Sequence, residues 1–104
     1  MWISFNEPKV LEFLLSKGYI YTIRHYPARP PRIRSVKQGR KFLGFKVEIE
    51  TIQKVASFGV IYAEDVLSGR VSESGFQSLT EWKAAVARQH KDRGELWLLR
   101  ATKI

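Results

Sequence analysis

The sequence predicts one small α+β domain, in which two main helices accompany a sheet of five or six strands. Three observations support this: apolar residues at helical spacing over residues 10–15, strand alternation over residues 42–50, and the capping-box sequence SLTE at residues 78–81. A chain of 104 residues is long enough for one hydrophobic core and too short for two. We therefore expect a single domain over residues 1–104.

The first third of the chain predicts a helix, a strand and a stiff loop. Asn6 is expected to cap a helix that ends before Gly18. Residues 19–26 alternate as a strand, which places Thr22 and Arg24 on the same face. The three prolines that follow rule out a central strand and favour an extended loop; they are Pro27, Pro30 and Pro31.

The rest of the chain predicts the longest strand, a second helix and a closing strand. Residues 42–55 alternate until the parity slips, which indicates a bulge or bend near Thr51. Residues 58–67 suggest a short strand and a helical turn, and the SLTE sequence opens the second helix. The apolar C-terminal sequence ELWLLRATKI predicts a central strand. The three tryptophans are expected in the core: Trp2, Trp82 and Trp97.

Positive charge is concentrated in one segment. The net charge is +8, and residues 24–46 hold eight Lys or Arg residues with no Asp or Glu, whereas the rest of the chain holds ten cations and ten acids. Focused positive charge attracts phosphate backbones or anionic surfaces. We call this set the basic segment: Arg24, Arg29, Arg32, Arg34, Lys37, Arg40, Lys41 and Lys46.

Aromatic residues beside the basic segment favour an RNA with unpaired bases as its partner. Tyr21 and Tyr26 are placed to stack on bases while arginines neutralise phosphates, and DNA is a possible partner as well. Arg32 and Arg34 flank Ile33, so both guanidinium groups are expected to point outward together. The residues predicted to contact nucleic acid are Tyr21, Arg24, Tyr26, Arg29, Arg32, Arg34, Lys37, Arg40 and Lys41.

Composition excludes several classes of site. The chain has no Cys, so it forms neither a disulfide nor a thiolate metal site. No apolar run approaches the roughly 20 residues that span a bilayer, and no signal-peptide core is visible near the first residues. The sequence therefore predicts a cytoplasmic protein without a membrane, metal or cofactor partner. A basic module that docks on an acidic protein is the remaining binding alternative.

Two stretches resemble the ASCH domain, a family of the PUA-like superfamily of small β-barrels. The sequence SKGYIYTIR (residues 16–24) follows the first helix, where the family carries a Gly-x-Lys-x-x-Glu-x-Arg motif, and GFQSLTEW (residues 75–82) resembles the family's second helix entry. With the closing GELWLL strand, the resemblance covers most of the chain. It implies a small mixed PUA-like barrel with an RNA-related role.

The resemblance also implies a possible enzyme. Some small members of the family are amidohydrolases that act on N4-acetylcytidine through a Lys, a Thr and a Glu, and a ribonuclease activity has been assigned to another. Here Thr22 and Arg24 stand at motif positions, whereas Lys17 replaces the motif Gly and Tyr19 replaces the motif Lys. Glu73 is an approximate counterpart of the family acid. The candidate catalytic residues are therefore Lys17, Tyr19, Thr22, Arg24 and Glu73.

Overall fold

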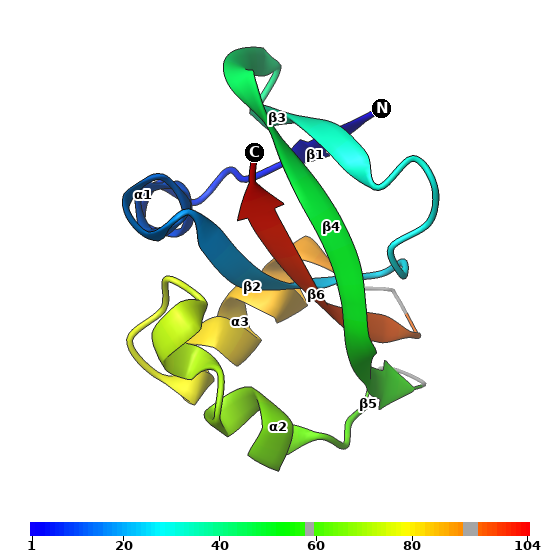
Figure 1. Cartoon of the computed structure of the whole chain (residues 1–104). Coiled ribbons are helices and arrows are strands. Elements are labelled where there is room, and N and C mark those ends of the chain that lie inside the picture. The colour runs from blue at the N-terminus through cyan, green and yellow to red at the C-terminus, as the bar shows by residue number, and fades with distance from the viewer. Residues whose placement is uncertain (58–59, 91–93) are drawn as a thin grey trace.

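One mixed sheet organises the molecule (Figure 1). The structure is a computed structural model that describes residues 1–57, 60–90 and 94–104. The strands run in the order β1-β3-β4-β6-β2, with β5 paired to the end of β4; β1 and β3 are parallel, and the other pairs are antiparallel. The strands are β1 (Trp2–Ser4), β2 (Tyr19–Arg24), β3 (Ile33–Gln38), β4 (Lys41–Ser57), β5 (Val60–Ile61) and β6 (Leu96–Lys103).

The two longer helices match the two that the sequence predicts. They are α1 (Pro8–Lys17) and α3 (Leu79–Gln89), and between β5 and α3 the chain also forms a short helix, α2 (Glu64–Ser68), and a 3-10 turn, η1 (Val71–Glu73). The Ser78 side chain accepts a hydrogen bond from the Glu81 backbone N–H at 3.1 Å, which confirms the predicted helix cap. The molecule is thus a small α+β domain. None of the helices in the described ranges is long and apolar enough to cross a membrane.

Strand β4 lies at the centre of the sheet, between β3 and β6. It extends over 17 residues and pairs with β3 along its first part and with β6 from Val47 onward. Its register with β6 shifts between Thr51 and Gln53, which confirms the bulge predicted near Thr51, and shifts again between Lys54 and Ala56. The β3–β4 turn lies at one end of the molecule, and α2 and β5 lie at the other (Figure 1).

The start of α1 differs from the prediction. Glu7, not Asn6, occupies the N-cap position and makes no side-chain cap, because Pro8 already begins the helix with a favourable backbone angle. The Asn6 side chain instead accepts a hydrogen bond from the Gly39 backbone N–H at 2.8 Å, which ties the N-terminal segment to the β3–β4 turn. Gly18 ends the helix in the left-handed conformation, with φ of 83°, as the sequence predicts.

The turn before α3 packs directly on α1. Gly75 has φ of 84°, and a Cβ atom at this position would lie 2.8 Å from the Val10 Cα atom. Only glycine therefore allows this approach, which places Ser74 and Phe76 beside the first helix. Both residues line the cavity described below.

The core forms largely where the hydrophobic pattern places it, with two exceptions among the tryptophans. Trp82 is buried as predicted, whereas Trp97 is half-buried and Trp2 is exposed. Trp2 lies on β1, a three-residue strand that the sequence analysis did not predict; Ile3, its neighbour, takes the core position. Of the strand predicted over residues 58–62, Val60 and Ile61 form β5, and positions 58–59 lie outside the described residues.

Candidate functional site

The exposed cations of the basic segment lie on the β2–β3 loop, at the β3–β4 turn and on β4. Arg29 and Arg32 are exposed on the loop, and Arg40 and Lys41 are exposed at the turn. Lys46 is exposed on β4. The turn consists of Gly39 and Arg40, and Gly39 supplies the positive φ, 60°, that a tight two-residue hairpin needs at its first position. The fold thus spreads this exposed charge over the two connections that flank β3 and the first part of β4.

The exposed cations of the basic segment are not neutralised. Six ion pairs join described residues, and every cation in them comes from elsewhere in the chain. Unpaired like charges in proximity raise the local positive potential, so this region attracts anions. The pairs are Lys9–Glu81, Lys54–Glu95, Arg70–Glu73, Lys83–Glu64, Arg88–Glu7 and Arg100–Glu50.

Arg34 does not belong to this exposed set, so its predicted outward orientation is wrong. Its side chain is only 6% exposed and faces the core side of β3, opposite the buried Val47. Its Nε donates to the Pro31 carbonyl at 3.1 Å and its Nη2 to the Arg29 carbonyl at 3.2 Å. The parity of β3 is thus opposite to the predicted one, since Ile33 is 48% exposed. Arg34 holds the proline loop in place and is unavailable to a ligand.

The two tyrosines predicted to stack on bases are covered. Tyr21 is 6% exposed, and the Arg70 guanidinium lies 4.5 Å from its ring centroid. Tyr26 is half-buried, with the Arg34 guanidinium 5.4 Å from its centroid and the His25 ring packed edge-on against it. The prediction that Tyr21 forms a stacking surface is therefore wrong, because its ring is buried beneath Arg70, which lies between α2 and η1.

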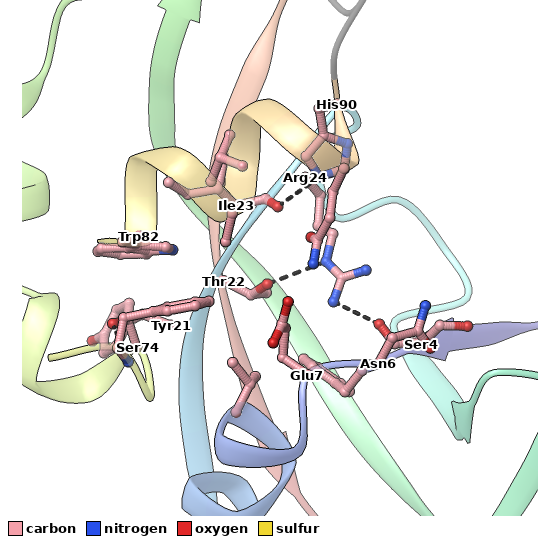
Figure 2. A pocket seen from close by; sticks show the side chains of 16 residues that line it. Ser4, Asn6, Glu7, Tyr21, Thr22, Ile23, Arg24, Ser74, Trp82 and His90 are labelled. Carbon is pink, nitrogen blue, oxygen red and sulfur yellow. Dashed lines mark hydrogen bonds between the residues drawn. The ribbon is translucent and has the colours of Figure 1, made fainter. Parts of the chain in front are cut away.

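A cavity of about 320 Å³ lies between the end of β2, the segment after β1, and α3. This volume is at the small end of the range for small-molecule sites. Figure 2 shows Tyr21, Ser74 and Trp82 on one side of it, and Arg24, Ser4 and Asn6 on the other. Its walls combine aromatic and aliphatic side chains with a few polar groups.

Arg24 is the charged group that β2 contributes to this cavity. Its Nε donates to the Thr22 hydroxyl oxygen at 3.2 Å and its Nη2 to the Ser4 carbonyl at 2.8 Å (Figure 2). The predicted placement of Thr22 and Arg24 on one face is therefore confirmed. Burial lowers the pKa of Arg24, but a guanidinium stays charged at neutral pH. Within the described chain no carboxylate pairs with it; the Phe5 ring lies 4.9 Å away instead.

The remaining candidate catalytic residues lie elsewhere. Tyr19 donates a hydrogen bond from its hydroxyl to Glu73 at 2.7 Å, and Arg70 binds the other oxygen of the same carboxylate at 3.0 Å. These bonds hold the pKa of Glu73 below its usual value and raise that of Tyr19. Neither residue lines the Arg24 cavity, and Lys17 is exposed at the end of α1. The five candidates thus do not form one site. Thr22 and Arg24 lie together in the cavity, Tyr19 and Glu73 bind each other outside it, and Lys17 lies apart from both pairs.

Two exposed aromatic residues were missed by the sequence analysis. Trp2 is 53% exposed and Phe42 is 58% exposed, and both lie beside Lys37 of the basic segment. Strand alternation in the first four residues could have placed one of Trp2 and Ile3 outside, had β1 been predicted.

Comparisons with family models, with curated proteins and with solved structures found no match for this chain.

Proposed function

We propose that this protein binds RNA through the solvent-accessible cations of its basic segment. The proposed contacts are five exposed residues, Arg29, Arg32, Arg40, Lys41 and Lys46, and the half-buried Lys37. The observation that supports the proposal best is that none of these six cations forms an ion pair within the described residues, although six carboxylates are paired with cations elsewhere.

Electrostatics explains why a polyanion suits this surface. Like charges that are held near one another repel, and a ligand with regularly spaced phosphates relieves that repulsion and releases its own counterions. Four to six phosphate contacts would give a log-affinity slope of about −3 to −5 against log salt concentration. We also propose that the chain is a member of the ASCH family of PUA-like barrels and that it is located in the cytoplasm.

Charge reversal on the loop tests the proposal. The double variant Arg29→Glu with Arg32→Glu should weaken binding of a mixed-sequence single-stranded oligoribonucleotide by about tenfold or more and reduce the salt slope by about 2. Both side chains are exposed, so the melting temperature should move little. Fluorescence anisotropy at several salt concentrations measures affinity and slope together.

A matched control separates local charge from total charge. Lys17→Glu with Arg88→Glu changes the net charge by the same amount on α1 and α3, away from the basic segment. Arg88 is exposed and its pair with Glu7 is a surface contact at 3.6 Å, so its loss should cost at most about 1 kcal/mol, which thermal unfolding of the control variant checks. Equal losses in the two double variants would show that binding follows total charge, and unchanged affinity in the loop variant would contradict the proposal. A pull-down partner that survives nuclease treatment would favour an acidic protein as the ligand instead.

The Arg24 cavity favours a second candidate, a hydrolase of the ASCH type. Thr22 and Arg24 meet in a cavity large enough for a small ligand, and they occupy positions at which the resemblance implies function. This candidate predicts turnover of N4-acetylcytidine that is lost in Thr22→Ala. The absence of product at high enzyme concentration would exclude it, while a ribonuclease would instead cleave the oligoribonucleotide used above.

A further inference from the structure

Trp2, Lys37 and Phe42 lie together on the solvent-facing side of three neighbouring strands. Lys37 on β3 pairs with Ser4 of β1 on one side and with Phe42 of β4 on the other. Trp2 precedes Ser4 by two residues and so shares its side of β1. The residues between them, Ile3 and Val36, face the core. The strand register therefore brings two aromatic rings and one ammonium group onto the same face.

The two rings remain open to solvent although each contacts the lysine. The Lys37 Nζ atom lies 4.6 Å from the Trp2 ring centroid and 4.9 Å from the Phe42 ring centroid, while both aromatic residues are more than half exposed. Aromatic side chains of this size usually gain stability by burial, so two of them exposed on one face indicate a surface that a partner covers.

The charges around the rings decide the kind of partner. Lys46 lies on the same face, opposite Ser35, and Arg40 and Lys41 follow at the adjoining turn. Two acids lie farther along this face of β4: Glu48, opposite Ile33, and Glu50, which pairs with Arg100. A second copy of the chain would bring these cations against themselves across a twofold axis, which repulsion opposes. A partner with flat apolar groups and regular negative charges fits better.

We propose that Trp2 and Phe42 are a stacking site for the unpaired bases of a single-stranded RNA, with Lys37 between them contacting the phosphate that links the bases. This inference rests on the proposed function and adds what the cations alone do not specify. The bases of a duplex are already stacked on one another, so the site selects single strands.

Alanine substitutions at the two rings test the site. Trp2→Ala and Phe42→Ala should each weaken binding of an eight-nucleotide single-stranded oligoribonucleotide by about 5- to 150-fold, corresponding to one lost stacking contact. Their salt slopes should match that of the wild type, because no phosphate contact is removed. Tyr62→Ala is the control, since Tyr62 is 57% exposed but follows β5 at the opposite end of the molecule (Figure 1).

Conservative variants provide a readout that a purely structural role would not produce. Trp2 is more exposed than Trp82 or Trp97, so RNA should quench the protein's tryptophan fluorescence chiefly through Trp2. Trp2→Phe should lose no more than half of the binding free energy that Trp2→Ala loses. It should nevertheless lose most of the fluorescence quenching. Phe42→Trp should retain affinity and increase the quenching.

The possible failures are distinguishable. If the wild type binds no RNA, both the proposed function and this inference are overturned. If the wild type binds RNA but both alanine variants bind equally well, or if a duplex of the same length competes as strongly as the single strand, the stacking site is overturned and the electrostatic function stands. A peptide rich in acidic residues that outcompetes the RNA would also overturn the stacking site.

Discussion

The arginines on the core side of the sheet and those on the connections that flank β3 come from the same stretch of sequence but have opposite environments. Arg24 and Arg34 donate hydrogen bonds to backbone carbonyls and lie near aromatic rings. Arg32 and Arg40 are exposed and unpaired among the described residues. The environment that the fold gives each side chain, and not the density of charge in the sequence, therefore decides which cations can meet a ligand.

The largest expected effect is the loss of the Arg34 side chain. Arg34→Ala removes two hydrogen bonds and leaves the Pro31 and Arg29 carbonyls without their partner, so we expect a loss of about 2 to 3 kcal/mol in unfolding free energy. For a domain of this size the melting temperature should fall by about 10 °C or more. Arg32→Ala, two residues away, should change the unfolding free energy by less than about 0.5 kcal/mol.

This pair of variants tests directly whether the buried arginine contributes more to stability than the exposed one. Thermal and urea unfolding of both variants measure the two changes. Equal stability losses at positions 32 and 34 would show that the loop does not depend on the buried guanidinium. The exposed arginine should show its importance in RNA affinity instead, because Arg32→Ala removes one of the proposed phosphate contacts.

A smaller effect is expected from the paired charge at Glu73. Its pKa is lowered chiefly by the Tyr19 hydrogen bond and also by Arg70, so these contacts add stability above the ordinary glutamate pKa of about 4.3. That stability, about 1 kcal/mol, is lost as pH falls through the lower pKa of the folded state. Glu73→Gln should therefore be less stable than the wild type at pH 7, and the gap should shrink toward pH 3.

Urea unfolding at several pH values measures this gap. Tyr19→Phe is a useful second variant, because it removes the hydroxyl donor and leaves the ion pair with Arg70 intact. The difference in unfolding free energy between Tyr19→Phe and the wild type should also shrink toward pH 3, but it should be smaller than the difference for Glu73→Gln. A gap that stays constant between pH 7 and pH 3 would show that Glu73 contributes nothing through its charge.

Much of the fold could be predicted from local patterns. The SLTE sequence determined the start of α3, Gly18 marked the end of α1, and the parity slip located the bulge in β4. These features depend on neighbours in sequence, so the residues alone express them. Strand β1 was missed because three residues are too few to show alternation, and its parallel pairing with β3 is a long-range contact.

The candidate site was predictable in charge but not in orientation. Charge segregation indicated correctly that the basic segment lacks neutralising acids. In β3, however, Ile33 and Val36 have opposite parity, and both are apolar enough for the core. The sequence pattern favoured Ile33 as the core residue, whereas the fold buries Val36. The side chains of β3 therefore face the sides opposite to the predicted ones. This reversal buries Arg34 and brings Lys37 to the outer face beside Trp2 and Phe42.

The length of β4 has a consequence for how the proposed RNA-binding surface can be studied. One strand of 17 residues carries Phe42 and Lys46 at its beginning and hydrogen-bonds to β6, the closing strand, farther along. A fragment ending near residue 57 would keep every proposed RNA contact yet leave the buried edge of β4 without its neighbour. The proposed RNA-binding surface is therefore not a detachable peptide, because its shape depends on pairing with the C-terminal strand β6.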